Sequence, residues 1–512
     1  MNKLPAYIAL MDTTLRDGEQ TQGVSFTAGE KLNIAQALLE ALKVDRIEIA
    51  SARVSEGEKE TVRIINDWAA QHGYLDQVEV LGFVDHTLSI DWILDCGGRV
   101  LNLLTKGSEN HCQNQLGKTL EQHAEDIKKT VAYAKENGIN VNVYLEDWSN
   151  GYKDNKDYVF GLMSLIKDIG IEHFMLPDTL GVMSPTEVTE ALTDMQAHFP
   201  KQLFDFHPHN DYGLAVANCM AAVSTGISNL HCTVNCLGER AGNVSLAELA
   251  VVLKDKMGIK TAINENNLGY VSKMVESFSG KWLSDNAPIV GEDVFTQTSG
   301  IHADGDVKGG LYETKLHPER FDRKRSYALG KLSGKASVLK NIEELGISLS
   351  ADNLQKVLDR VVKLGDSKEI ITPDDLPFII ADVLESSDYN HIRLLECQIY
   401  SLFGDESEVK LALNINGADY EDVGHGNGGF SAFMDALKKI MERLDFKLPE
   451  LIDYAVRIPN GGKAGALTEC NITWDIEGSR GRNLRTRGVY ANQVYAAVIA
   501  TLRMDNTLLH GS

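Results

Sequence analysis

Two histidines separated by a single residue stand near the middle of the chain. His207-Pro208-His209 ends a short apolar run, and side chains two positions apart on a strand point to the same face, so both imidazoles can reach one ion. Asp17 adds a carboxylate from a distant segment. Such a nitrogen and oxygen site with open positions suits Mg, Mn, Zn or Fe(II) alike. A lone histidine at a strand end is usually structural, but the pair favours a metal site.

The open positions of this site indicate its chemistry. A 2-oxo acid can chelate an ion through its keto and carboxylate oxygens, and the ion then acts as a Lewis acid on the carbonyl. Arg16, adjacent to Asp17, would place a permanent cation beside the oxygen on which negative charge develops. Thr179 offers a hydroxyl to the substrate carboxylate, although a turn or a helix cap explains this threonine almost as well.

A parallel sheet is the scaffold that the sequence predicts for these residues. Short apolar, β-branched runs alternate with helical patterns over residues 7–243. The eight runs occupy residues 8–12, 46–50, 78–84, 100–105, 141–146, 173–177, 203–207 and 230–235. Eight strand–helix units fit the α/β class and a closed TIM (β/α)8 barrel, whose active site is built at the carboxyl ends of its strands. The candidate residues end or follow these runs.

Helix signals support the alternation. Residues 27–42 have apolar positions at helical spacing, and Thr27 with Glu30 makes a capping box at their start. Residues 186–198 follow Ser184-Pro185, which places an N-cap and then a proline in the first helical position. We expect both helices outside the sheet.

The remaining sequence predicts two further parts. Residues 1–265 form the barrel, 266–388 a linker with helical subdomains, and 389–512 a separate α+β regulatory domain, with the joint at 386–388. Strands are expected at residues 394–401, 408–415, 451–457 and 468–475, and helices at 430–444 and 492–504. No internal repeat is evident beyond the strand–helix alternation.

The composition of the chain limits its possible binding partners and its location. The 512 residues carry a formal net charge of -23, so nucleic acid and anionic membrane surfaces are disfavoured as partners. No apolar run is long enough to span a bilayer, which predicts a cytoplasmic protein. The seven cysteines form an odd set without a Cys-x-x-Cys pair, which favours reduced, mostly buried thiols. Cys232 and Cys236, four positions apart, remain a minor alternative as metal ligands.

Several motifs together resemble one enzyme family. LRDGEQ (residues 15–20) with Lys31, and FDFHPHNDYGLAVA (residues 204–217), are similar to the two signature motifs of the isopropylmalate, homocitrate and citramalate synthases. GERAGN (residues 238–243) and GIHADG (residues 300–305) are also similar to family motifs. The resemblance covers essentially the whole chain, including an inhibitor-binding C-terminal domain.

The resemblance implies a Claisen-type condensation with acetyl-CoA as cosubstrate and a divalent metal (Mn, Mg or Zn) as cofactor. A base removes a methyl proton from acetyl-CoA, the enolate attacks the keto carbon of a 2-oxo acid, and the thioester is hydrolysed. Arg16 stabilises the oxyanion, and Glu146, in a closed pocket, is favoured as the base; a solvated acid is the alternative reading of Glu146. The implied metal ligands are Asp17, His207 and His209, with Asn243 nearby. His302 and Tyr312 assist in proton transfer and hydrolysis and reach the barrel of the neighbouring subunit of a homodimer. His302 is the alternative to Glu146 as the base.

The acceptor is read from the expected pocket walls. LNLLT (residues 101–105) and VNVYLEDW (residues 141–148) are most similar to the citramalate synthases. Leu81, Leu104 and Tyr144 fall near strand ends, where their bulk leaves room for a methyl group and disfavours a branched acceptor. Pyruvate, giving (R)-citramalate for isoleucine biosynthesis, is therefore preferred to 2-oxoisovalerate, which 2-isopropylmalate synthases of leucine biosynthesis use. Ordinary barrel packing is the alternative role of these side chains.

The resemblance also implies feedback control. GHGNGG (residues 424–429) is similar to a loop that encloses an amino-acid end product, although as a lone Gly-rich loop it is also a weak phosphate signal. Phe430, Leu451, Tyr454 and Ile458 are candidate walls of this effector site, with core packing equally plausible. Isoleucine is the expected effector of a citramalate synthase and leucine of an isopropylmalate synthase. Rival readings are a lyase related to hydroxymethylglutaryl-CoA lyase, an Fe(II) oxygenase and a non-catalytic amino-acid sensor.

Overall fold

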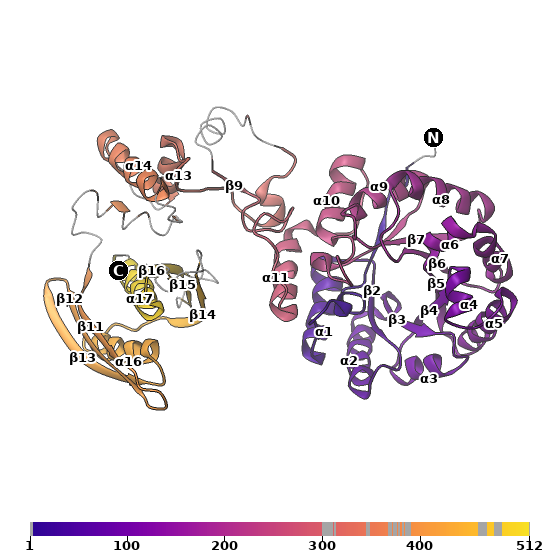
Figure 1. Ribbon diagram of the computed structural model, residues 1–512, viewed down its shortest axis with the longest axis horizontal. Coiled ribbons are helices and arrows are strands. Elements are labelled where there is room, and N and C mark those ends of the chain that lie inside the picture. The colour runs from indigo at the N-terminus through magenta and orange to yellow at the C-terminus, as the bar shows by residue number, and fades with distance from the viewer. Residues whose placement is uncertain are drawn as a thin grey trace. The chain divides into compact units, whose positions relative to one another are not determined.

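The computed structural model divides into two compact units, Met1–Phe295 with Thr314–Lys324, and Thr296–Glu313 with Arg325–Ser512 (Figure 1). The residues that it describes are 4–298, 311, 314–344, 349–366, 371, 376, 379–380, 383, 391–458, 468–475 and 484–510. No helix within these ranges is both long enough and apolar enough to cross a lipid bilayer.

The first unit contains the predicted barrel. Eight parallel strands pair in sequence order and close, β1 with β8. They are β1 (Ala9–Asp12), β2 (Arg46–Ser51), β3 (Val78–Phe83), β4 (Val100–Lys106), β5 (Asn140–Glu146), β6 (His173–Asp178), β7 (Leu203–Pro208) and β8 (Asn229–Cys232). The eight-stranded α/β barrel expected from the sequence is thus confirmed. β8 ends three residues earlier than expected, because the chain turns at Val234–Cys236, where Asn235 and Cys236 have positive φ.

Helices surround the barrel wall (Figure 1). They are α1 (Ala28–Gln36), α2 (Glu56–His72), α3 (Leu88–Asp95), α4 (Glu109–Asn114), α5 (Leu120–Glu136), α6 (Trp148–Asp154), α7 (Lys156–Ile166), α8 (Pro185–His198), α9 (Ala215–Thr225), α10 (Leu246–Met257) and α11 (Leu268–Ser279). The capping box of Thr27 and Glu30 is confirmed, as is Pro185 in the first turn of α8. The first helix is not uniform, because after Gln36 it continues as a π-helical turn, Ala37–Leu42.

The two faces of the barrel strands differ in chemistry. Side chains that face the helices form one large apolar core, which includes Ile8, Leu10, Leu101 and Phe206. Polar residues alternate with them along the strands and are themselves buried: Glu48, Glu79, Asn102, Asn142, Asp205 and His231. The barrel interior is therefore a hydrogen-bonded polar layer rather than a purely branched-aliphatic one.

The described residues of the second unit form a small helical cluster, a strand pair and two three-stranded sheets. Helices α13 (Lys335–Glu344) and α14 (Ala351–Asp366) pack around Val338, Ile342 and Val357. The strand pair β9 (Thr296–Gln297) and β10 (Ser326–Tyr327) precedes them. The GIHADG motif at 300–305 and the expected joint at 386–388 lie outside the described residues.

The C-terminal part contains two copies of one arrangement. Three antiparallel strands and a helix, β11 (Ile392–Tyr400), β12 (Ser407–Ile415), β13 (Ala418–Gly426) and α16 (Gly429–Glu442), are followed by β14 (Glu450–Arg457), β15 (Thr468–Asp475), β16 (Leu484–Tyr490) and α17 (Gln493–His510). The sequence reading found neither this repeat nor β13 and β16. β13 is an edge strand that is mostly polar on both faces, so it has little of the apolar alternation that marks a half-buried strand.

Glycines in equivalent strands explain how each helix approaches its sheet. A Cβ atom on Gly424 of β13 would lie 2.1 Å from the carbonyl oxygen of Ala432 in α16, and one on Gly488 of β16 would lie 1.9 Å from that of Ala496 in α17. The expectation of a glycine-rich loop at 424–429 was therefore wrong in its first half, since Gly424, His425 and Gly426 belong to β13. Gly424 serves close packing of strand against helix.

Candidate metal centre

The three expected metal ligands come from two regions of the barrel rim that flank β8. His207 is in β7, and His209 follows Pro208, the last residue of that strand. Asp17 stands in the turn after β1, where its backbone N–H donates to the carbonyl of Thr13 at 2.8 Å. The β8 loop is tied to this turn, because the Val234 N–H donates to the Thr14 hydroxyl at 2.8 Å. Barrel closure thus brings residues 190 positions apart to one place.

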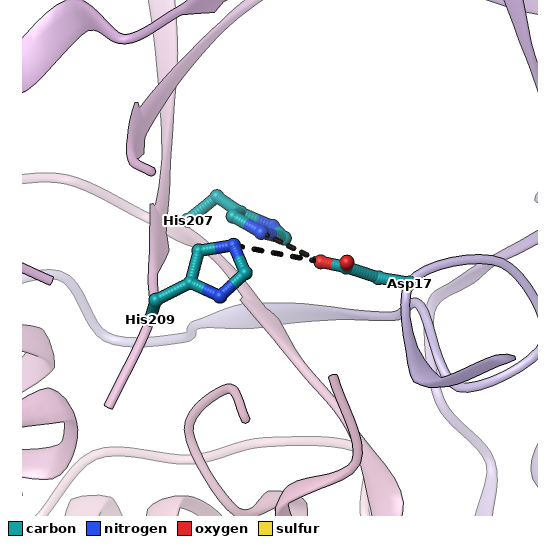
Figure 2. Close-up of side chains that lie close together, drawn as sticks. All are labelled: Asp17, His207 and His209. Carbon is teal, nitrogen blue, oxygen red and sulfur yellow. Dashed lines mark ion pairs between the residues drawn. The ribbon is translucent and has the colours of Figure 1, made fainter. Parts of the chain in front are cut away.

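Their side chains converge on one point (Figure 2). Asp17 Oδ2 lies 3.0 Å from Nε2 of His207 and 3.9 Å from Nε2 of His209. All three side chains are buried, and one potential ligand atom from each lies within 4.8 Å of the others. In the described part of the chain, this is the only group of three or more histidines, cysteines and carboxylates that meets this spacing.

Asn243 completes the group on the β8 side. It forms a β-bridge with His209, and its amide donates to Asp17 Oδ2 at 3.0 Å and to the carbonyl of Leu237 at 3.2 Å. Its Oδ1 is buried and receives no hydrogen bond. Buried acceptors are rarely left without a donor, so an uncompensated oxygen beside two imidazoles and a carboxylate fits a cation.

The protonation states favour a cation as well. Burial opposes ionisation of Asp17, but Arg16 and His207 outweigh it and hold the pKa of Asp17 well below its usual range. Burial lowers the pKa of His209 to about 4 despite the nearby Asp17. At neutral pH the site therefore presents an ionised carboxylate and a neutral imidazole, which are the states that bind metals.

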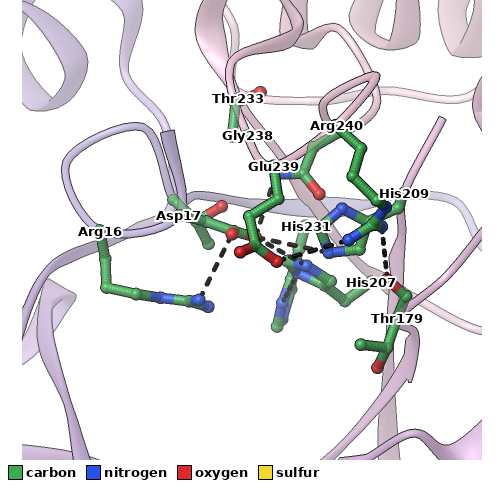
Figure 3. A network of polar contacts seen from close by, with 12 residues as sticks. Arg16, Asp17, Thr179, His207, His209, His231, Thr233, Gly238, Glu239 and Arg240 are labelled. Carbon is green, nitrogen blue, oxygen red and sulfur yellow. Dashed lines mark hydrogen bonds and ion pairs between the residues drawn. The ribbon is translucent and has the colours of Figure 1, made fainter. Parts of the chain in front are cut away.

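Arg16 is fixed beside this group (Figure 3). Its Nε donates to Glu48 at 2.5 Å, and its guanidinium lies 3.5 Å from Asp17 Oδ1 and 5.6 Å from the centre of the Tyr144 ring. Burial by itself would lower the pKa of Arg16, but the charges of Glu48 and Asp17 raise it above its usual value. A permanent cation thus borders the candidate metal centre.

The expected pocket walls form a cluster of their own. Leu81 and Tyr144 are buried together with Met11 and Met175, and Leu104 packs against them. This cluster is separate from the large core under the helices. The sequence analysis missed both methionines, although each stands in a predicted strand, Met11 five positions before Arg16 and Met175 four positions before Thr179.

Glu146 has different surroundings from those expected. Its carboxylate, at the end of β5, forms an ion pair with Lys106 at the end of β4, and its side chain is 27% exposed. The closed pocket expected around this residue is therefore wrong for the single chain, because a cation and solvent share its carboxylate. Lys106 was not singled out from the sequence.

Thr179 takes part in joining the loops at the rim. Its hydroxyl accepts a hydrogen bond from the Asp147 N–H at 3.0 Å. Its carbonyl accepts one from Arg240 at 2.7 Å (Figure 3). Arg240 also donates to Asp211 at 2.7 Å, so the loops after β6, β7 and β8 are linked. The hydroxyl hydrogen of Thr179 keeps its capacity to donate to a substrate oxygen.

Sequence reasoning also missed the residues that support the site from inside the barrel. Glu48 orients Arg16, while Asp205 and His231 lie beneath His207. Each is a polar residue between apolar neighbours in the middle of a strand. That pattern was a usable signal, since an isolated polar position on the inner face of a barrel strand needs partners there.

The remaining expected residues are placed only in part. His302 and Tyr312 lie outside the described residues. In the C-terminal part, the rings of Phe430 and Tyr454 lie 5.0 Å apart, whereas Leu451 and Ile458 on β14 and after it are 42% and 57% exposed. The aromatic pair is thus brought together, and the two aliphatic residues are open to solvent in the single chain. All seven cysteines are free.

Comparison with known proteins covers nearly the whole chain. Residues 7–275 match the family model described as HMGL-like, 289–369 the homocitrate synthase post-HMGL domain-like model, and 370–509 the LeuA allosteric (dimerisation) domain. A putative (R)-citramalate synthase of Methanothermobacter thermautotrophicus is 34% identical over 98% of both chains. A probable 2-isopropylmalate synthase of Methanopyrus kandleri is 32% identical over 99% of both.

A solved structure supports the fold independently. Hydroxymethylglutaryl-CoA lyase from Pseudomonas aeruginosa superposes with a TM-score of 0.50 at 19% identity, over 57% of this chain and 98% of the lyase. The lyase therefore matches little beyond the length of the barrel.

Proposed function

Because the chain belongs to the HMGL-like family, among the members that carry a LeuA allosteric domain, we propose that it is an acyltransferase that condenses acetyl-CoA with a 2-oxo acid. Pyruvate is the acceptor in this proposal, and (R)-citramalate and CoA are the products. The convergence of Asp17, His207 and His209 beside Arg16 is the observation that carries it.

Asp17, His207, His209 and, through its unpaired oxygen, Asn243 would hold a divalent Mn, Mg or Zn ion, which would polarise the keto group of the acceptor. Arg16 places its fixed charge where the keto oxygen becomes negative. The Thr179 hydroxyl donates to the acceptor carboxylate.

Glu146 is the proposed base. It takes a proton from the methyl group of acetyl-CoA, and the resulting enolate carbon forms a bond to the keto carbon, whose oxygen gains a proton. Water then cleaves the thioester and releases CoA. The ion pair with Lys106 keeps the Glu146 carboxylate at the end of β5, facing the same rim as the metal ligands. His302 and Tyr312 of a partner subunit are proposed to assist proton transfer and hydrolysis.

The proposed preference for pyruvate rests on the bulk of the side chains expected to line the acceptor pocket. Leu81, Leu104 and Tyr144 pack with two methionines into a buried cluster on the inner side of the barrel. A pocket bounded by these side chains has room for a methyl group, and each additional methylene of the acceptor would cost about 1–3 kcal/mol. 2-Isopropylmalate synthesis from 2-oxoisovalerate is the second candidate, because relatives with that name are as similar in identity and coverage.

The match to the LeuA allosteric domain supports a proposal of regulation by an amino acid. We place isoleucine between Phe430, Leu451, Tyr454 and Ile458, in a homodimer that the dimerisation domain forms. The proposal requires that isoleucine bind one of two states more tightly, since only differential affinity shifts an equilibrium.

Release of free thiol tests these assignments. Purified protein is incubated with acetyl-CoA and Mn²⁺, and pyruvate, 2-oxoisovalerate or 2-oxoglutarate is added separately. We expect the fastest release with pyruvate, loss of release on chelation, and inhibition by isoleucine rather than leucine. Equal or faster release with 2-oxoisovalerate would overturn the acceptor assignment, and absence of release with every acceptor would overturn the enzyme assignment.

A further inference from the structure

A chain of buried polar contacts continues inward from His207. His231 of β8 has its Nδ1 3.2 Å from Nδ1 of His207 and its Nε2 3.1 Å from Oδ2 of Asp205 in β7. Both His231 and Asp205 are completely buried. Asp205 is fixed in turn by Arg46 and by His173, whose Nδ1 lies 2.8 Å from the other carboxylate oxygen.

The direction of these hydrogen bonds follows from Asp205, the innermost residue of this series of contacts. Oδ2 of Asp205 is ion-paired with Arg46, whose guanidinium can only donate, so this oxygen acts as an acceptor towards His231 as well. His231 therefore donates from Nε2 and keeps a lone pair on Nδ1. The only ring hydrogen that His207 can direct at this lone pair is on its own Nδ1, so Nε2, on the side of Asp17, is the nitrogen that can bind a cation.

Tyr144 also approaches this lone pair. Its hydroxyl lies 3.2 Å from Nδ1 of His231. It has a second acceptor, however, in Oε2 of Glu48 at 3.5 Å. Within the described residues, His231 Nδ1 is the one acceptor within hydrogen-bond distance of His207 Nδ1, so this lone pair is assigned to His207.

We propose that His231, backed by Asp205, is a positioning residue that holds His207 in the tautomer and orientation that bind a divalent cation. The inference rests on the proposed metal site and goes beyond it, since His231 contacts Nδ1 of His207 and not the nitrogen that faces Asp17. Partners of this kind on a coordinating imidazole fix its ring and raise its basicity. His209 has no such support, because its Nδ1 is buried without a partner.

Titration of the metal-free full-length protein with Mn²⁺ alone tests the proposal. We expect His231→Phe, which keeps a ring but lacks an acceptor, to weaken Mn²⁺ binding about 10- to 100-fold. His231→Gln, whose side-chain oxygen can accept from His207, should recover most of the affinity. His173→Gln is the matched control, because it alters the other imidazole on Asp205, and should bind within about twofold of wild type.

The outcomes separate the two claims. If wild type binds Mn²⁺ and His231→Phe binds it equally well, the positioning role is wrong and the metal site stands. If wild type itself does not bind Mn²⁺, both are wrong. Should the variants not fold, neutron diffraction of metal-free wild-type crystals decides: we expect exchanged hydrogens on Nδ1 of His207 and Nε2 of His231, and the reverse pattern overturns the proposal.

Discussion

Glu146 shares its carboxylate with Lys106 at the adjoining ends of β4 and β5. We predict that Glu146→Gln lowers kcat about 10²- to 10⁴-fold, because the amide cannot take the methyl proton, while affinity for Mn²⁺ is retained. Steady-state thiol release and metal titration measure the two quantities. Glu136→Gln, an exposed change at the end of α5, is the control. A Glu146→Gln enzyme with near wild-type kcat would assign the base to another residue.

Leu104 packs against the buried cluster of Leu81 and Tyr144. Leu104→Ala should enlarge the space beside the acceptor and raise the ratio of kcat/KM for 2-oxoisovalerate over pyruvate about 10-fold or more. Its neighbour Leu103 faces the helices and belongs to the large core, so Leu103→Ala should lower the melting temperature without changing that ratio. If both variants leave the ratio unchanged, Leu104 does not bound the acceptor.

The sequence predicted the proposed metal ligands but not the buried residues that support them from inside the barrel. Asp17, His207 and His209 were predictable because two-residue spacing at a strand end forces both imidazoles onto one face. His231 and Glu48 were not, since their role depends on which strands adjoin when the barrel closes. Lys106 was missed because the ion pair it forms joins adjacent strands 40 positions apart.

At the scale of elements, His123 fastens α5 to the end of β4. It accepts a hydrogen bond from the Lys106 N–H at 3.0 Å, and burial lowers its pKa to about 4. An unfolded histidine titrates near 6.5, so between these values the unfolded chain binds more protons. The contribution of His123 to the free energy of unfolding is therefore fully present above about pH 6.5 and falls as the pH drops towards 4.

We predict that His123→Gln makes the melting temperature less dependent on pH. Glutamine can still accept from the Lys106 amide but does not titrate. The difference between melting temperatures at pH 7 and pH 4.5 should be smaller in the variant than in wild type. Parallel curves for the two proteins would show that His123 does not remain neutral in the folded state.

Gly488 allows α17 to lie directly on β16. Gly488→Ala should destabilise the C-terminal unit by about 1–3 kcal/mol, because the added methyl group overlaps the carbonyl of Ala496 and forces the helix away. Gly428 has extended backbone and open space around a Cβ atom, so Gly428→Ala should shift the same transition much less. Limited proteolysis and thermal melting report the change, and equal effects of the two substitutions would contradict it.

Element prediction succeeded most fully in the barrel. All eight barrel strands were found within three residues at either end, because their apolar runs are bounded by helix signals. In the C-terminal part, β13 is an exposed edge strand and its glycines suggested a loop, although they mark close helix packing. The twofold repetition of three strands and a helix has no clear counterpart in the sequence pattern and emerged only from strand pairing.

For the molecule as a whole, the barrel, the intervening region and the allosteric domain match three family models in the order expected from the sequence. The acceptor is the point on which the relatives divide, because some carry the name citramalate synthase and others 2-isopropylmalate synthase at similar identity. It depends on the few side chains that line the pocket, and overall similarity says little about them.

A competition assay measures this point directly. Wild-type protein, Mn²⁺ and limiting acetyl-CoA are mixed with equal concentrations of pyruvate and 2-oxoisovalerate, and both products are quantified by NMR. The product ratio equals the ratio of the two kcat/KM values. We predict citramalate in at least about tenfold excess, consistent with a pocket that rejects the branched acceptor. An equal or greater yield of 2-isopropylmalate would contradict the proposed function.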